Sequence, residues 1–494
     1  MAHLGVKQGE LAFFDADGRP APPAPARDTD DRLQVLRGGL RTALLPLGLR
    51  LLQTADVKRG DAFVLVLDND RTSVACVSAA MHLQCTCVLM SASRVALLRY
   101  VTAETGVTTV VTVDDATVSV SVARGHAARD AARESAATLW YNSPADVLQR
   151  GGVCLLTSGS VGEPKVVFCT WNHMLLQGES THQQLFPQGP ARIICATSIS
   201  HAFSINAVFA LLTSPHDAQS ELCFAPTFAG LYSLLAQRSA LFTVLYATPG
   251  TYTAFATMPP TALHADVSYC AGAHLSRSLF HKMRDKYGLV LMQNYGSTET
   301  GDIAAWHLRG KKVDAEVNEL ESSAIERYVG SVWPGVQAYT NDNGEIAVKT
   351  PWQSEGYVKA RVLHRVSGVL LTSDLGIVAQ DDGRVECIWL QGRRRPEVET
   401  KWQGLRTTYS PNEIEAVLIA HPSVSDGLVL IQNEANREQG IIRARIVLHD
   451  GAAVDEVAIK GWCVQHNMPA LEDALVVEVA RFLPCSPAGK LMYA

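Results

Sequence analysis

Runs of apolar residues with little polar alternation recur through the first part of the chain. Those at 62–67, 107–113 and 192–196 are rich in Val, Leu and Ile and predict strands, while 72–82 and 207–212 predict helices. Strands that are apolar on both faces and separated by helices are typical of parallel sheets covered on both sides. The pattern therefore predicts a doubly wound α/β body.

The pattern changes toward the C-terminus, where short alternating runs are separated by turn signals. Asp342-Asn-Gly344 and Asp381-Asp-Gly383 predict antiparallel hairpins. A helix is predicted at 411–420, with Ser410 as its N-cap and Glu413 completing a capping box. Strands are predicted at 428–431 and 442–447, and a helix at 454–466. These elements predict a small α+β unit after Gly392.

Length and composition support two folded domains. Of its 494 residues, 47% are hydrophobic and 19% are charged, which is typical of a folded protein. A chain of this length is too long for a single hydrophobic core. The proline-alanine stretch at 20–27 predicts a linker between an initial arm and the body. We expect an N-terminal domain at 1–391 and a C-terminal domain at 392–494.

Charge and cysteine usage narrow the class of partner and the compartment. A net charge of −6 gives no general attraction to nucleic acid or to anionic membranes. No signal peptide is recognised, and the apolar stretch at 74–90 predicts a buried helix and strand rather than a membrane span. The eleven scattered cysteines predict buried free thiols. A cytoplasmic protein is expected.

The strongest local signal for chemistry is a polar loop at 155–165 that follows a predicted strand. Hydroxyls and backbone N–H groups freed by glycine can surround a polyphosphate, and a lysine adds positive charge. An ordinary polar turn is the alternative, and the loop lacks the Gly-Lys-Ser/Thr of a Walker A motif. The residues concerned are Thr157, Ser158, Gly159, Ser160, Gly162 and Lys165.

This loop resembles the Ser/Thr-Gly-Ser/Thr-x-Gly-x-Pro-Lys signature of the adenylate-forming superfamily, which includes acyl- and aryl-CoA synthetases, peptide-synthetase adenylation domains and beetle luciferases. Further motifs that resemble those of the superfamily follow in the same order. They are Asn294-Tyr-Gly-Ser-Thr-Glu-Thr300, Gly330-Ser-Val-Trp-Pro-Gly335, Gly344-Glu-Ile346, Thr372-Ser-Asp374, Gly392-Arg393 and Pro484-Cys-Ser-Pro-Ala-Gly-Lys490. The resemblance implies a large N-terminal domain with doubly wound sheets and a distorted barrel, and a mobile α+β C-terminal domain.

The resemblance also implies a role for each matching residue, and the cofactors ATP and Mg²⁺. Tyr295, with Asn294 and Gly296 beside it, would stack on adenine. Thr298 and Glu299 would meet the α-phosphate and Mg²⁺, a cation that prefers oxygen ligands. Asp374 and Arg393 would bind the ribose hydroxyls. Lys490 would bridge the acid and the α-phosphate in the transition state.

Two regions concern the acyl group and its acceptor. His201, Phe203, Ser204, Gly272, Ala273 and Ser297 resemble the residues that line the acid in this superfamily. No carboxylate lies between Ser198 and Val208 to balance an ammonium, so a neutral aryl or other non-amino acid is favoured. Gly404 matches the residue beside the thiol tunnel, although the intervals between the hinge motifs around 394–412 are longer than usual.

The sequence therefore predicts an ATP-dependent enzyme that converts a small carboxylic acid to an acyl-adenylate. The acyl group then passes to a thiol, either CoA or the phosphopantetheine of a carrier protein. An amide synthetase with an amine acceptor is the near alternative. A nucleotide-binding pseudoenzyme and a P-loop NTPase are alternatives of other classes, disfavoured by the retained Lys490 and Glu299 and by the missing Walker sequence. The acid, the acceptor and the oligomeric state stay undetermined by the sequence.

Overall fold

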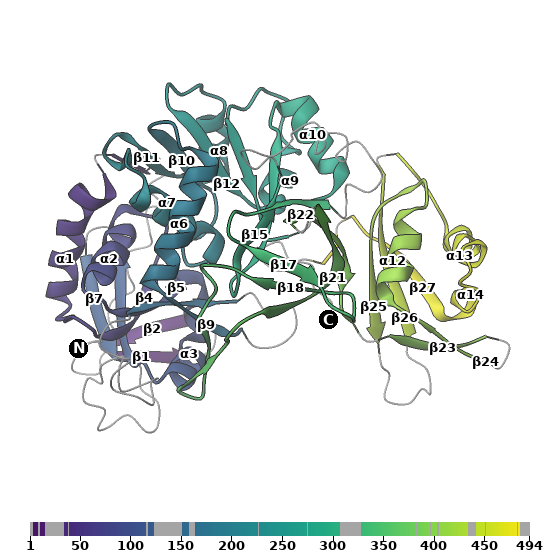
Figure 1. The fold of residues 1–494 in the computed structure, drawn as a ribbon, viewed down its shortest axis with the longest axis horizontal. Coiled ribbons are helices and arrows are strands. Elements are labelled where there is room, and N and C mark those ends of the chain that lie inside the picture. The colour runs from purple at the N-terminus through teal and green to yellow at the C-terminus, as the bar shows by residue number, and fades with distance from the viewer. Residues whose placement is uncertain are drawn as a thin grey trace.

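A computed structural model gives the architecture of the chain (Figure 1). The structure describes residues 3–7, 10–14, 34–37, 39–114, 117–122, 151–157, 164–225, 227–273, 275–306, 328–381, 384–395, 397–402, 405–432, 441–449, 451–481 and 483–484. None of the helices within these ranges has the length and apolar content that a bilayer crossing requires.

The first large sheet has eight strands and a parallel centre. In spatial order they are β20 (Val362–Arg365), β19 (Gly356–Lys359), β9 (Val166–Thr170), β8 (Gly152–Leu156), β5 (Thr86–Ser91), β4 (Ala62–Leu67), β6 (Thr109–Asp114) and β7 (Thr117–Val122). The β8, β5, β4 and β6 strands run parallel, whereas β9 returns antiparallel from β8. The β19–β20 hairpin joins β9 from far along the chain.

The second sheet has twelve strands and changes character along its length. Its order is β17 (Gln337–Thr340), β18 (Glu345–Lys349), β21 (Leu370–Asp381), β22 (Arg384–Arg393), β16 (Tyr328–Val332), β15 (Gly301–Ala305), β14 (Leu291–Ser297), β13 (Val267–Cys270), β12 (Phe242–Ala247), β10 (Ala191–Cys195), β11 (Glu221–Phe224) and β3 (Gln34–Leu36). The run from β11 to β14 is parallel, and the run from β14 to β17 is antiparallel. The predicted hairpin at Asp342-Asn-Gly344 is confirmed between β17 and β18.

Helices cover both faces of the parallel strands. They are α1 (Leu45–Thr54), α2 (Arg71–His82), α3 (Leu98–Thr105), α6 (Trp171–Leu185), α7 (Ala202–Thr213), α8 (Phe228–Leu235), α9 (Pro249–Phe255) and α10 (Arg277–Tyr287), with short turns η1 (Leu40–Leu44), η2 (Ala92–Leu97) and η3 (Asp217–Gln219). On β4, Leu65 faces the core that contains α6 and α7, whereas Val64 and Val66 face the opposite core. This two-sided burial explains the unbroken apolar runs and confirms the predicted α/β class.

The C-terminal unit has its own core and lies beside the large body (Figure 1). It contains β23 (Val398–Trp402), β24 (Leu405–Tyr409), α12 (Pro411–Ile419), β25 (Val424–Gln432), β26 (Ile441–Leu448), α13 (Glu456–Gln465), α14 (Leu471–Ala474) and β27 (Leu475–Val479). A two-stranded hairpin, β1 (His3–Lys7) and β2 (Glu10–Phe14), begins the chain. The predicted capping box of α12 is present: Ser410 N–H donates to Glu413 at 3.0 Å. The domain limits at 391 and 392 stay a prediction.

Candidate nucleotide and acyl site

The two ends of the predicted phosphate loop are held together where β8 turns back into β9. Thr157 N–H donates to the Lys165 carbonyl at 3.0 Å, and Lys165 N–H donates to Thr157 Oγ1 at 3.0 Å. The Tyr100 hydroxyl donates to the Pro164 carbonyl at 2.6 Å, and Arg94 donates to the carbonyl of Thr157 at 3.4 Å. These contacts fix the base of the loop. The predicted residues Ser158, Gly159, Ser160 and Gly162 lie outside the described residues.

Tyr295, Asp374 and Arg393 form one polar constellation. The Tyr295 hydroxyl donates to Asp374 Oδ2 at 2.7 Å, and Arg393 Nε donates to Asp374 Oδ1 at 3.1 Å. Asp374 and Arg393 are directly paired across β21 and β22, which explains their proximity. Burial, and then the Asp374 carboxylate, hold the pKa of Tyr295 well above its usual value, so the phenol stays a hydrogen-bond donor. The structure brings these three predicted residues together, and their roles in nucleotide binding stay a prediction.

Two features of the backbone shape this constellation. A β-bulge follows Tyr295, and a Cβ at Gly296 would lie 2.3 Å from the Gly301 carbonyl oxygen, so only glycine fits there. Ser373 has a φ of 62°, a conformation that favours glycine. Its N–H donates to the buried Glu345 carboxylate at 2.7 Å, which helps to hold this turn.

Glu299 lies in a turn that follows β14. Its backbone carbonyl accepts from Ser354 N–H at 2.8 Å, and its Oε1 accepts from the Tyr357 hydroxyl at 3.2 Å. Ser297 Oγ accepts from the N–H groups of Glu299 and Thr300 at 3.2 Å, so it caps the turn. Thr298 is half-buried in the same turn. The turn thus presents a carboxylate on a fixed backbone.

The donor set of this turn fits a magnesium ion that arrives with phosphates. Glu299 offers carboxylate oxygens and Thr298 a hydroxyl, and hard oxygen donors are those that Mg²⁺ prefers. Among the described residues no group of three or more His, Cys, Asp or Glu side chains could hold a metal. With one carboxylate from this turn, further ligands would come from substrate phosphates and water.

The predicted acyl-site residues occupy the first turn of α7 and the end of β13. His201 is the residue before α7 and is half-buried, as are Phe203, Gly272 and Ala273. The Phe203 ring lies against the rings of Tyr246 and Tyr269, at centroid distances of 5.2 and 5.3 Å. Ser204 is fully buried and its hydroxyl bonds to that of Thr197, so this hydroxyl serves the protein interior.

A buried carboxylate that the sequence analysis missed lies behind this region. Asp302, on β15, accepts hydrogen bonds from amide and hydroxyl donors on three elements. They are Gln177 Nε2 at 3.1 Å, Thr181 Oγ1 at 3.4 Å, Asn206 Nδ2 at 3.3 Å and Asn294 Nδ2 at 2.6 Å. Burial raises its pKa, and these donors act in the opposite direction.

This network qualifies two expectations from the sequence. The Asn294 amide donates to Asp302 and accepts from Trp333 Nε1 at 3.1 Å, so its side chain is used inside the protein; its part in nucleotide binding stays a prediction. The segment from Ser198 to Val208 does lack a carboxylate, but the tertiary structure brings Asp302 to it from β15. No local signal marks Asp302, because its partners come from distant elements.

Two further predicted residues, Lys490 and Gly404, lie outside the described residues. The hinge segment that precedes Gly404 is described in part. Arg395 Nη2 donates to Glu415 at 2.6 Å and Arg395 Nη1 to the Val429 carbonyl at 3.1 Å, so this arginine is tied into the C-terminal unit. Its neighbour Arg393 instead faces Asp374 of the large body. Two arginines only two positions apart therefore have side-chain partners on different parts of the chain.

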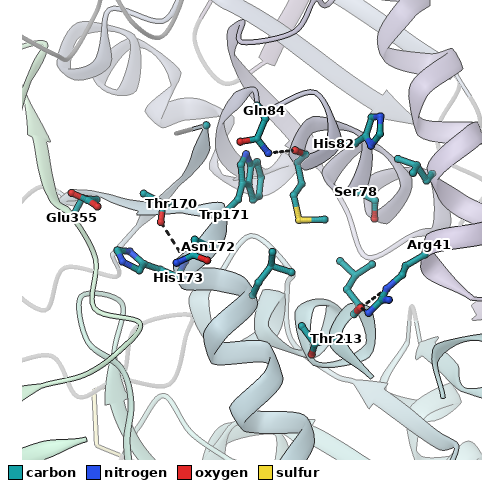
Figure 2. Close-up of a pocket in the computed structure, with 15 residues that line it drawn as sticks. Arg41, Ser78, His82, Gln84, Thr170, Trp171, Asn172, His173, Thr213 and Glu355 are labelled. Atoms are coloured by element: carbon teal, nitrogen blue, oxygen red, sulfur yellow. Dashed lines mark hydrogen bonds between the residues drawn. The ribbon is translucent and has the colours of Figure 1, made fainter. Parts of the chain in front are cut away.

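A cavity of about 830 Å³ lies away from these residues (Figure 2). Thr170 and Trp171, at the start of α6, line it together with Arg41 and Met81. Thr170 pairs with Gly152, at the end of the β8–β9 hairpin opposite the phosphate loop. This cavity is therefore separate from the predicted nucleotide site.

Comparison with known proteins shows sequence similarity to one enzyme family. A model of the AMP-binding enzyme family matches residues 46–358. The chain is 24% identical over 356 residues to 4-coumarate–CoA ligase 4 of Arabidopsis thaliana, covering 68% of this chain and 60% of the relative. It is 25% identical over 365 residues to 4-coumarate–CoA ligase of Pinus taeda, covering 68% and 63%. The matched part is thus under two thirds of these relatives' length.

Solved structures share the fold at low identity. ATP-bound MatB from Rhodopseudomonas palustris has a TM-score of 0.64 and 19% identity, covering 91% of this chain and 90% of that one. The amide bond synthetase McbA from Marinactinospora thermotolerans has a TM-score of 0.65 and 20% identity, covering 94% and 96%. Together with the family match, this shows that the chain belongs to the AMP-binding enzyme family of the adenylate-forming superfamily.

Proposed function

We propose that this protein uses ATP to convert a carboxylic acid to an acyl-adenylate and then transfers the acyl group to a thiol. The observation that carries the proposal is the contact of Tyr295 and Arg393 with Asp374. All three residues belong to the twelve-stranded sheet, in which the turn between β14 and β15 carries Glu299. It offers an aromatic ring for a base and charged groups for ribose hydroxyls. The hydrogen bonds between Thr157 and Lys165 hold the two ends of the loop together, which supports the proposal that this loop binds phosphate.

The reaction consists of two balanced steps. A carboxylate oxygen of the acid forms a bond to the α-phosphorus of ATP, and the bond from that phosphorus to pyrophosphate breaks. A thiol sulfur then bonds to the acyl carbon, its proton passes to water, and the bond from that carbon to the phosphate oxygen of AMP breaks. Lys490 stabilises the charge that builds in the first step. Mg²⁺, held by Glu299 and the phosphates, supplies charge neutralisation when bound.

CoA or a carrier-protein phosphopantetheine is the acceptor that we propose. The curated relatives are named as CoA ligases, which supports a thiol. An amine is the alternative acceptor, because the intervals between the hinge motifs are longer than usual and β23 and β24 form a hairpin in that stretch. The amide bond synthetase McbA has the same fold.

The acid that we propose is an aryl or other non-amino acid. The first turn of α7 offers half-buried His201 and Phe203, and the Phe203 ring packs on Tyr246 and Tyr269; aromatic surroundings of this kind suit a flat ring. The carboxylate of Asp302 contacts Asn206 of α7, and its oxygens already accept from neutral protein donors. Burying the ammonium group of an amino acid without a free counter-charge costs on the order of several kcal/mol.

Pyrophosphate release with ATP and Mg²⁺ tests the first step. The acids are substituted benzoates, heteroaromatic carboxylates, straight-chain acids and the twenty proteinogenic amino acids. Aryl acids should exceed α-amino acids by at least about a hundredfold in kcat/KM, equivalent to about 2.7 kcal/mol. A preference for any proteinogenic amino acid would contradict the proposed acid class. Release with none of the acids would favour a nucleotide-binding pseudoenzyme.

Mass spectrometry of the products distinguishes the acceptors. Reactions with the best acid receive CoA, a pantetheine-loaded carrier protein or a panel of primary amines. A thioester as the main product supports the thiol, and an amide supports the alternative.

A further inference from the structure

We infer that Tyr357 is a positioning residue that sets the metal-binding carboxylate Glu299 and the phosphate-loop lysine Lys165 before the nucleotide arrives. The inference rests on the proposed function and adds a residue to it. Tyr357 belongs to β19, and sequence analysis gives it no role. Its two contacts join segments that lie far apart in the chain: the loop after β8 and the turn after β14.

The first contact fixes a carboxylate. The Tyr357 hydroxyl donates to Glu299 Oε1 at 3.2 Å. A tyrosine hydroxyl ordinarily carries its proton at neutral pH, so it can donate to this carboxylate. A hydrogen bond to an ionised group is stronger than one between neutral groups. One oxygen of Glu299 is thus oriented, and no hydrogen bond joins the other oxygen to any residue that the structure describes.

The second contact holds an ammonium group. Lys165 Nζ lies 5.0 Å from the centroid of the Tyr357 ring, within the range of a cation–π interaction. The strand register explains this approach: Tyr357 is opposite Val167, and Lys165 stands two positions before Val167, immediately ahead of β9. The side chain of Lys165 is otherwise exposed and would adopt many rotamers.

The two contacts have different chemical roles, which makes them separable. Glu299 is held by the hydroxyl, and Lys165 is held by the ring face. A nucleotide that enters with Mg²⁺ finds the carboxylate for the metal and the ammonium for a phosphate already placed, so less ordering is needed on binding. Phenylalanine at this position would keep the ring and lose only the bond to Glu299.

Binding of a non-hydrolysable ATP analogue tests the inference. Isothermal titration calorimetry with and without Mg²⁺ is applied to the full chain, to Tyr357→Phe and to Tyr357→Leu. Wild type should bind more tightly with Mg²⁺. Tyr357→Phe should lose about tenfold of the affinity measured with Mg²⁺ and none of that measured without it. Tyr357→Leu should lose about fivefold without Mg²⁺ as well, because the lysine is no longer held.

A matched control removes a tyrosine hydroxyl bond elsewhere. The hydroxyl of Tyr232, on α8, donates to the Pro259 carbonyl at 2.6 Å and takes no part in the proposed site. Tyr232→Phe should bind the ATP analogue as tightly as wild type does. Melting temperatures check that each variant is folded.

Three outcomes would overturn the inference and leave the proposed function standing. Tyr357→Phe could match wild type in both conditions, or could lose affinity equally in both, which a general packing defect would produce. If Tyr357→Leu behaved like Tyr357→Phe, the lysine would not depend on the ring. A wild-type protein that bound no analogue under any condition would remove the proposed function itself, and the inference with it.

Discussion

The Tyr295 hydroxyl donates a hydrogen bond of 2.7 Å to the Asp374 carboxylate, although 79 residues separate the two in the chain. Arg393 reaches the other oxygen of the same carboxylate at 3.1 Å. Asp374 is therefore held from two sides, and the plane of the Tyr295 ring is fixed relative to it. A nucleotide whose base stacks on this ring would bring its ribose to the carboxylate.

Removing the Tyr295 hydroxyl should weaken nucleotide binding more than it slows the reaction. In Tyr295→Phe the ring remains, but Asp374 keeps only Arg393. We expect the KM for ATP to rise about fivefold, which corresponds to about 1 kcal/mol for one hydrogen bond, with kcat within about twofold. Steady-state kinetics measures both values. Asp374→Ala, which removes the carboxylate that Tyr295 and Arg393 share, should cost far more; equal effects would contradict this arrangement.

Lys490→Ala should remove a charge contact made mainly in the transition state of adenylation. We expect a fall of roughly 10²–10³ in the rate of pyrophosphate release, or about 3–4 kcal/mol. Release is measured with saturating ATP and acid, and circular dichroism checks the fold. A near wild-type rate would refute the role given to Lys490.

Gly404→Trp should affect only the second half-reaction. A large side chain at this position would narrow the predicted route of the thiol, so acyl-AMP should still form while the thioester does not. The two products are followed by mass spectrometry in a single turnover. If both steps declined together, a folding defect would be the better explanation and the tunnel prediction would be wrong.

Ser373→Gly should stabilise the protein. Ser373 has a φ of 62°, and a non-glycine residue there carries backbone strain that glycine lacks. Glycine also makes the unfolded chain more flexible, which offsets part of the relief of strain. The free energy of unfolding should therefore rise by about 0.5–1 kcal/mol. Urea denaturation measures it. The β-branched Ser373→Val is the matched opposite and should destabilise; a loss of stability in the glycine variant would contradict the strain.

Asp426→Asn should stabilise the protein at neutral pH and not in acid. Burial raises the pKa of Asp426, on β25, from 3.8 to about 6, so the folded state binds a proton that the unfolded state releases between these values. Stability therefore falls as the pH rises through this window, and the cost of the ionised carboxylate is complete above it. Asparagine removes that cost and can still accept the 2.9 Å bond from Gly427 N–H.

The expected gain of Asp426→Asn is about 1–2 kcal/mol at pH 7.5, less than the full shift implies because the side chain is half-buried. Thermal unfolding at pH 4 and pH 7.5 measures it. Asp473→Asn, a change at an exposed position, should show no such pH-dependent difference. A gain of the same size at both pH values would mean that ionisation of Asp426 is not the cause.

The sequence by itself determined the α/β class, the hairpin at Asp342-Asn-Gly344 and the capping box of Ser410 and Glu413, because periodicity, turn residues and caps act over a few neighbouring positions. It also marked Tyr295, Asp374 and Arg393 through local motifs. Only the tertiary structure decided that Tyr357 contacts both Glu299 and Lys165, and that Asp302 lies behind the first turn of α7. Such contacts depend on which strands become neighbours: β19 joins β9 across the sheet, and β15 faces α6 and α7. No local pattern encodes that pairing, since burial of the whole core selects it.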